Sequence, residues 1–192
     1  MSPRRPIAEE LRKDKIIYAA RVQFLNKDFR QVSMRSIGAD VKCSHSALYH
    51  HFKNKADLFY AIVEKDFSDL NRLIEKTLQE ASEPEEKLSL LLLRFIEFGL
   101  NNQRQYEIMF LTRNSEAGRL SQRAASNSYQ HFTEIVRTLT DDVKPDEILS
   151  VFLSVHGFVT HYCGNVQSFQ EAEKAAEKHV EFVLKCVKIN RS

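Results

Sequence analysis

The sequence predicts an all-α protein, and three observations support this class. Glycine occurs 5 times and proline 4 times in 192 residues. Together they make up about 5% of the chain, whereas glycine and proline make up roughly 12% of an average protein. A β-sandwich or barrel needs many tight turns built from these two residues, so an all-β fold is excluded. Apolar residues recur at helical spacing along most of the chain, and helix-capping residues stand between these stretches. Together they predict about nine helices.

The first expected helix covers residues 7–27. Its apolar residues, among them Leu11 and Phe24, recur at a spacing of 3.6 residues and form one stripe. Asp28 follows where the chain leaves the helix, and aspartate tolerates the left-handed backbone that often ends a helix. Phe29 is expected to pack back onto this helix.

Two short helices and one long helix should follow. Ser33 is an N-cap candidate for a helix over 34–40, and Ser44 is an N-cap candidate for a helix over 45–51. A long helix is then expected over 55–80.

The rest of the chain is also helical by pattern. Ser82 and Glu85 have the spacing of a capping box, and Pro84 suits a first turn, so a helix is expected over 83–102. Apolar residues surround this helix, which is typical of a core helix. Further helices are expected over 103–112, 114–139, 145–164 and 169–189.

The small net charge of +2 hides an asymmetry. Residues 1–55 hold 12 Lys and Arg against 5 Asp and Glu, a balance of +7, and the remainder carries −5. This distribution indicates a polyanion-binding module joined to a domain with another task. No apolar run is long enough for a membrane span or a secretory signal, and three widely spaced cysteines without a CxxC motif predict reduced thiols in a cytoplasmic protein (Cys43, Cys163 and Cys186).

The two short helices have the spacing of a helix-turn-helix. Ile37, Val41 and Leu48 can lock them together, and the small residues Gly38 and Ala39 allow close approach. The outer face of the second helix carries small or hydrogen-bonding groups suited to a major groove: His45, Ser46, Ala47, Tyr49 and His50. Lys53 and Lys55 flank this face, and the N-terminus of the next helix is suited to a phosphate.

Residues 16–62 resemble the DNA-binding domain of the tetracycline-repressor (TetR/AcrR) family. The resemblance is most specific in the segment from Ser44 to Leu58, which reads SHSALYHHFKNKADL. Three positions depart from the family pattern. Glycine is usual at the positions of Asp28 and Lys42, and glycine or proline is frequent at Ser46.

The resemblance implies a role for each matching residue. Arg35 would reach a base or a phosphate, Tyr49 and Lys55 would hold phosphates, and His51 would be structural. The full set of implied DNA contacts is Ser33, Arg35, Ser44, His45, Ser46, Ala47, Tyr49, His50, Lys53 and Lys55.

The same resemblance implies the division of the chain and its function. A helix-turn-helix domain over 7–54 would be joined by the long fourth helix to a helical effector-binding and dimerisation domain over 55–192. The expected function is a ligand-responsive regulator, a repressor released from its operator by a small, partly apolar molecule, with no cofactor. The alternative is a helical adaptor that binds proteins and lacks specific DNA binding. The sequence shows no catalytic constellation, so an enzyme is not expected.

A regulator that reads two half-sites is expected to be a homodimer. Two apolar stripes near the C-terminus are candidates for a four-helix interface across the twofold axis. They consist of Phe152, Val155, Val159 and Tyr162, and of Ala172, Ala176, Val180, Val183 and Val187. The alternative is that both stripes face only their own domain.

Aromatic residues of the second domain are candidates for an effector pocket. They are Phe95, Phe98, Tyr106, Phe110, Tyr129, Phe132, Phe158, His161 and Tyr162. The alternative for most of them is an ordinary helical core. A metal site from His156, His161 and Cys163 is not expected, because the two histidines lie about 140° apart around a helix.

Overall fold

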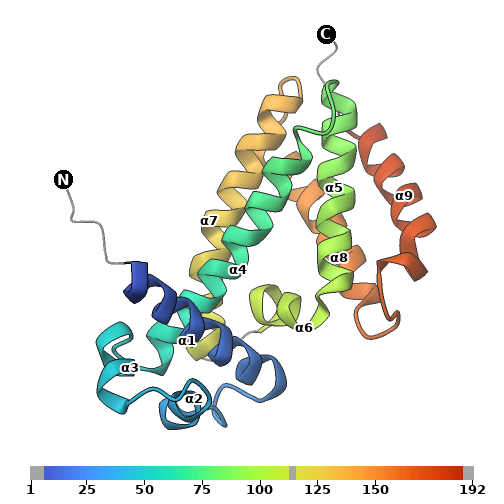
Figure 1. Ribbon diagram of the computed structural model, residues 1–192. Helices are drawn as coiled ribbons and strands as arrows, with labels where there is room; N and C mark the ends of the chain where they lie inside the picture. The colour runs from blue at the N-terminus through green and yellow to red at the C-terminus, as the bar shows by residue number, and fades with distance from the viewer. Residues whose placement is uncertain (1–6, 113–115, 188–192) are drawn as a thin grey trace, which may run out of the picture. The chain divides into compact units, whose positions relative to one another are not determined.

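The computed structural model describes residues 7–112 and 116–187, and these residues confirm the all-α prediction (Figure 1). They form nine α-helices and one π-helical segment. The helices are α1 (Ile7–Asn26), α2 (Met34–Asp40), α3 (His45–His51), α4 (Lys55–Thr77), α5 (Pro84–Asn101), α6 (Gln103–Tyr106), α7 (Glu116–Leu139), α8 (Pro145–Tyr162) and α9 (Phe169–Lys185), and the π-helix is η1 (Glu107–Leu111).

The chain divides into two compact units. Unit 1 contains the chain up to Asp66 together with Ile108–Ala124, and unit 2 contains Phe67–Glu107 and the chain from Ala125 onwards. The helix α4 therefore supplies its first half to one unit and its second half to the other. This division differs from the expected boundary between residues 54 and 55, because the first half of α4 belongs to the compact unit of α1–α3.

The core of unit 1 is built where α1 packs on α2 and α2 packs on α3. Phe24 of α1 stacks on Phe29 with ring centroids 5.8 Å apart, and both rings meet the edge of Phe59 of α4. Phe29 thus packs back onto the first helix as predicted. The carboxylate of Asp66 is buried in α4 and is paired with Arg21 of α1.

Two of the three predicted helix caps are confirmed. The Ser33 hydroxyl accepts from the backbone N–H of Ser36 at 3.1 Å, and the Ser44 hydroxyl accepts from the N–H of Ala47 at 3.2 Å. The capping box predicted at Ser82 is wrong. Helix α5 begins one residue later, with Glu83 as its N-cap residue and no side-chain cap bond, although Pro84 does stand in the first turn.

The expected left-handed residue after α1 is also wrong. Within the described residues, the non-glycine residues with positive φ are Lys42 and Asp142, and Asp28 is not among them. The N–H of Asp28 instead donates to the side chain of Gln31 at 3.1 Å, and its carbonyl accepts from the N–H of Gln31 at 2.9 Å. A local turn therefore ends α1 without a left-handed residue.

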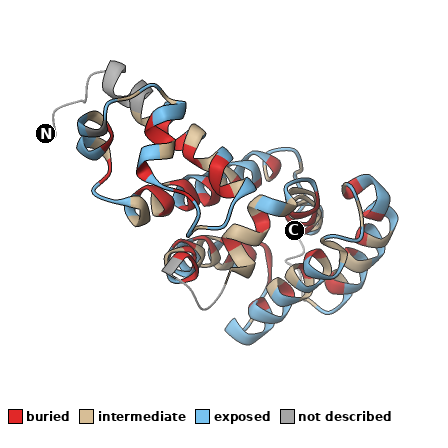
Figure 2. Ribbon diagram, turned by 90° about the horizontal axis from the view of Figure 1, so that it is seen from below, coloured by how far each residue is buried: buried red, intermediate tan, exposed pale blue. Residues whose placement is uncertain are grey.

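Unit 2 is organised around α5, which packs against both α8 and α9 (Figure 1). Buried and exposed residues alternate along most helices, as expected for amphipathic helices (Figure 2). Helix α5 approaches α8 closely at Gly99, where an added Cβ would stand 2.5 Å from a methyl group of Val159. Glycine at this position is therefore required by the packing of the two helices.

The helix predicted over 103–112 consists of two different pieces. Gln103–Tyr106 is one α-helical turn, and Glu107–Leu111 continues as a π-helix. π-helical segments are rare and often mark functional sites. The long helix α4 ends at Thr77 rather than near residue 80.

None of the helices in the described part of the chain combines the length and the apolar character that crossing a membrane requires.

Candidate functional site

The helix-turn-helix is locked by two side chains that are completely buried, Ile37 of α2 and Leu48 of α3. Gly38 permits the close approach, since a Cβ there would lie 3.4 Å from the carbonyl oxygen of Cys43. Val41 is half-buried, but Ala39 is exposed and plays no part in the lock. The structure thus confirms Ile37, Leu48 and Gly38 in their predicted roles.

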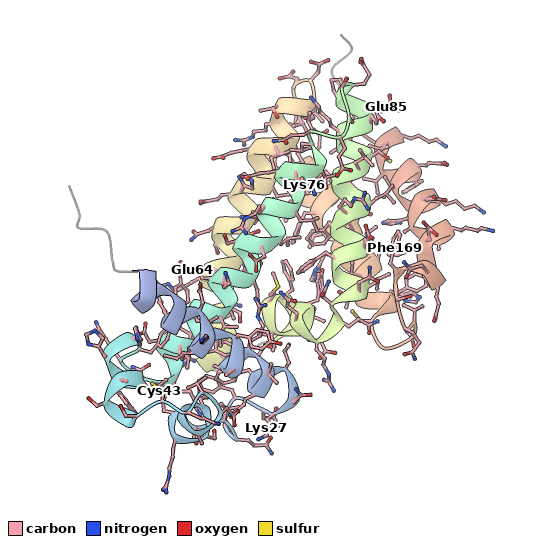
Figure 3. All side chains as sticks on the ribbon, viewed as in Figure 1. Lys27, Cys43, Glu64, Lys76, Glu85 and Phe169 are labelled. Carbon is pink, nitrogen blue, oxygen red and sulfur yellow. The ribbon has the colours of Figure 1, made fainter. Side chains whose placement is uncertain are left out.

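The turn between α2 and α3 is a Schellman motif. The N–H of Cys43 donates to the carbonyl of Gly38 at 2.9 Å, and the N–H of Lys42 donates to the carbonyl of Ala39 at 3.2 Å. This geometry places Lys42 at the left-handed position with φ of 51°, where a residue with a Cβ is strained by roughly 1–2 kcal/mol. Figure 3 labels Cys43, the next residue in this turn.

Most of the predicted DNA contacts lie on the surface of unit 1. Seven of the ten are exposed: Ser33, Arg35, Ser44, Ser46, Tyr49, His50 and Lys53. Ala47 is half-buried, and the side chain of His45 lies outside the described residues. The recognition helix α3 therefore presents hydroxyl, phenol and imidazole groups to solvent, as groove contact requires.

Lys55 has a different role from the one expected. Its ammonium group donates to the backbone carbonyl of Phe29 at 2.7 Å and to that of Val32 at 3.0 Å. The same group lies 4.3 Å from the ring centroid of Phe29. The expected phosphate contact is therefore revised to a structural one, in which Lys55 connects the start of α4 to the α1–α2 loop.

The N-terminus of α4 is likewise capped from within the chain. The side-chain oxygen of Asn54 accepts from the N–H of Asp57 at 2.8 Å, and the carboxylate of Asp57 accepts from the N–H of Lys53 at 3.0 Å. An acidic side chain at a helix N-terminus is favourable, but it also occupies the position expected for a phosphate. The predicted phosphate site at this helix end is therefore not supported.

Comparison with known proteins identifies this part of the chain. Residues 16–62 match the family model described as bacterial regulatory proteins, tetR family. The match covers the second half of α1, all of α2 and α3, and the start of α4. Residues 16–62 are therefore a DNA-binding domain of the TetR type. The family consists of regulators rather than enzymes.

Solved structures extend the similarity over the whole fold. NalD from Pseudomonas aeruginosa, the secondary repressor of the MexAB-OprM multidrug efflux pump, has a TM-score of 0.70 and 21% identity over 94% of this chain and 98% of its own. FadR from Bacillus subtilis, solved in complex with stearoyl-CoA, has a TM-score of 0.69 and 15% identity over 90% and 95%. A TetR/AcrR-family regulator from Thermobifida fusca has a TM-score of 0.67 and 19% identity over 90% and 96%. No curated protein sequence matches the chain.

Unit 2 contains a cluster of aromatic rings centred on Phe152 of α8, hereafter the Phe152 cluster. The Phe152 ring meets three rings of two other helices edge to face, at centroid distances of 5.2–5.8 Å: Phe95 of α5 and Tyr129 and Phe132 of α7. It also stacks on His156 of its own helix at 5.7 Å and 9°. Four residues of the predicted pocket thereby come together: Phe95, Tyr106, Tyr129 and Phe132.

The Phe152 cluster contains a polar pair, formed by buried Tyr106 and half-buried His156. The hydroxyl oxygen of Tyr106 and Nδ1 of His156 lie 2.5 Å apart and share a hydrogen bond. Burial raises the pKa of the Tyr106 phenol, with a smaller contribution from Cys163, so the phenol stays protonated and able to donate. The prediction from sequence missed Phe152 and His156 as members of this cluster, although their spacing of four residues places them on one face of α8.

The remaining candidates for the effector pocket lie elsewhere. Phe158 and Tyr162 have ring centroids 4.6 Å apart, and Phe158 also lies 5.0 Å from His179 of α9. His161 is exposed beside Tyr162, and Phe98 is half-buried in α5. Phe110 belongs to unit 1. Within the described part of unit 2, Phe98, Phe158, His161 and Tyr162 therefore make no ring contact with the Phe152 cluster.

Most of the predicted dimer stripe is buried within a single chain, which revises that prediction. Six of its nine residues are at most 4% exposed: Val155, Val159, Ala172, Ala176, Val180 and Val183. Phe152 belongs to the ring cluster, and Tyr162 and Val187 are half-buried. Helix α5 covers the stripes from inside unit 2, so the stripes face their own domain.

The outer face of α8 and α9 carries apolar side chains instead. Leu149 and Leu153 of α8 are 43% and 53% exposed, and Phe182 of α9 is 63% exposed. Gly157 continues the four-residue spacing of the two leucines, and an added Cβ there would meet nothing within 4 Å. A hydrogen bond of 3.0 Å between the side chains of Ser154 and His179 joins α8 to α9.

We predict that Lys55→Met lowers the free energy of unfolding by about 1–3 kcal/mol, because the carbonyls of Phe29 and Val32 lose a charged donor. Lys53→Met is the matched control, because Lys53 is exposed and should hardly affect stability. Chemical denaturation of both variants measures this difference. Equal stability of the Lys55→Met variant and the wild type would contradict the structural role.

Proposed function

We propose that this regulator is a homodimeric repressor that a small, partly apolar molecule releases from its operator. The observation that carries the proposal is the pairing of two features in one chain. An exposed recognition helix stands in unit 1, and a polar pair surrounded by aromatic rings stands in unit 2. The protein would act in the cytoplasm, where bacterial DNA is accessible.

Operator binding is assigned to the outer surface of α2 and α3. Ser46 and Ala47 would face base edges, with the Ala47 methyl group suited to a thymine methyl. Arg35 and His50 would donate to bases or phosphates, and Tyr49, which is 41% exposed, would bind a phosphate. His45 would join the base contacts.

The effector is assigned to the Phe152 cluster. Four helices contribute to the cluster, so a molecule bound there would contact α5, α6, α7 and α8 together. Aromatic walls with one hydrogen-bonding pair suit a partly apolar molecule that carries a polar group. FadR, which shares the fold, was solved with stearoyl-CoA, and NalD is a repressor of an efflux pump. The stearoyl-CoA bound to FadR supports a partly apolar effector, and NalD supports repression.

The dimer is assigned to the exposed face of α8 and α9. Side chains that are already buried inside unit 2 offer little further area, whereas Leu153 and Phe182 together expose a large apolar surface. Exposed apolar patches of this kind mark interaction sites. A second copy of the chain would bury the same face on each side of a twofold axis.

Release follows as a shift between populations of two conformations. The effector would bind more tightly to the conformation whose two DNA-binding units do not match the operator half-sites, and this difference in affinity weakens DNA binding. Helix α4 is a covalent path for this coupling, because its two halves belong to the two units.

Purified protein should shift DNA taken from beside its own gene in a gel assay, and the shift should weaken steeply with salt. Tyr49→Phe removes only the phenol hydroxyl, so it should weaken binding to all sequences alike. A loss confined to one base position would contradict the phosphate role. Absence of specific binding to both this DNA and a random library, with dimerisation intact, would favour the adaptor function.

Partly apolar molecules, stearoyl-CoA among them, can be screened for release of the bound operator. Tyr106→Phe should raise the concentration needed for release by about tenfold or more, because a buried hydrogen bond to the molecule is lost or misplaced. Tyr60→Phe makes the same chemical change in unit 1 and should leave release unaltered. If Tyr106→Phe and Tyr60→Phe require the same concentration for release, the effector does not bind at the Phe152 cluster.

Phe182→Glu and Leu153→Glu should each weaken the dimer by roughly tenfold or more, because a charge would be buried at the centre of the interface. Gln170→Glu adds a charge at an exposed position of α9 away from these residues and is the control. Sedimentation equilibrium measures the dissociation constant. Unchanged dimers in both glutamate variants would place the interface on another face.

A further inference from the structure

The turn that joins α2 to the recognition helix contains a lysine at a strained backbone position. Lys42 has φ of 51° and occupies the residue after the C-cap of α2. The two hydrogen bonds of the Schellman motif, from the N–H groups of Lys42 and Cys43, hold it there. Glycine fits this position without strain, since it has no Cβ.

Strain at a single residue points to a contribution of its side chain that glycine cannot make. The surrounding turn does not need the lysine for packing, because Lys42 is exposed and the lock between the helices consists of Ile37 and Leu48. What distinguishes lysine from glycine here is a long side chain with a positive charge.

The position of Lys42 relates it to DNA. Lys42 lies two positions before Ser44, whose hydroxyl caps the N-terminus of α3. In a helix-turn-helix, the N-terminal residues of the recognition helix contact base edges between two phosphate backbones. A flexible cation next to this helix end is suited to a backbone phosphate as a point charge.

The acidic residue nearest to Lys42 in the sequence is Asp40, and its carboxylate is hydrogen bonded to α1. The carboxylate of Asp40, two residues before Lys42, accepts from the side-chain amide of Gln23 at 2.6 Å. Gln23 is buried and also accepts from the hydroxyl of Ser36 at 2.8 Å, so this network holds Asp40 toward α1. The wider surroundings are basic, with a balance of +7 over residues 1–55.

We propose that Lys42 contacts a phosphate of the operator, which makes the turn of the helix-turn-helix part of the DNA interface. The proposal rests on the DNA-binding function. It adds a contact that the sequence comparison did not assign, because the family usually has glycine at this position. The strain in the free protein is then offset when DNA is bound.

Three substitutions separate the charge from the backbone strain. Lys42→Gly removes both the charge and the strain, Lys42→Asn removes the charge but tolerates the left-handed backbone, and Lys42→Arg keeps the charge. Lys42→Gly should raise the melting temperature and yet weaken operator binding. One phosphate contact at 0.1 M salt is worth on the order of five- to tenfold in affinity. Lys42→Asn should show the same loss of affinity, and Lys42→Arg should bind as the wild type does.

The slope of log affinity against log salt provides the decisive measurement. Loss of one phosphate contact should reduce this slope by about 0.9, equally for all operator sequences. If the wild type binds the operator in a salt-dependent way, and Lys42→Gly is more stable but has the same affinity and the same salt slope, the proposal is overturned. A wild-type protein without salt-dependent binding would overturn the DNA-binding function as well.

Discussion

The DNA-binding unit depends on one ammonium group that holds together segments far apart in the sequence. Lys55, at the start of α4, donates to two carbonyls of the loop that connects α1 to α2. These carbonyl groups belong to a loop and take no part in helix hydrogen bonds. The ammonium group of Lys55 supplies them with a charged donor. Phe29 lies under the same group and packs against Phe24 and Phe59. The loop leads directly to Ser33 and α2, so this contact also sets where the helix-turn-helix begins.

In unit 2, the hydrogen-bonded pair of Tyr106 and His156 likewise connects segments that are far apart in the sequence. Tyr106 and His156 come from α6 and α8, and their hydrogen bond gives the buried phenol of Tyr106 a polar partner. Phe95 and Phe152 pack against the pair, so the orientation of the rings is constrained by both hydrogen bonding and packing. Tyr106 is followed directly by the π-helix, and the division between the two units passes through that segment. The ring cluster and the change of backbone geometry are therefore neighbours along the chain.

Local features of the sequence predicted local structure well. Ser33 and Ser44 cap the helices expected of them, and Ile37 and Leu48 form the lock between α2 and α3. The predictions that failed concern helix ends at which two local conformations have similar free energies. Asp28 ends α1 through a turn with Gln31 and not in a left-handed conformation, and Glu83 begins α5 although Ser82 is the better capping residue by type. Such choices depend on differences of about 1 kcal/mol, which neighbouring packing readily overrides.

The sequence by itself determined that the chain is helical, that a helix-turn-helix lies near its basic N-terminus, and which faces of the last two helices are buried. These properties follow from periodicity, capping and charge, which are local. Only the tertiary structure decided what covers each face. Val155 and Val180 are covered by their own unit, leaving Leu153 and Phe182 exposed, and Lys55 turns toward backbone carbonyls and away from the role its position implied. The physical reason is that burial depends on which element arrives from elsewhere in the chain, and helical spacing carries no information about the identity of that element.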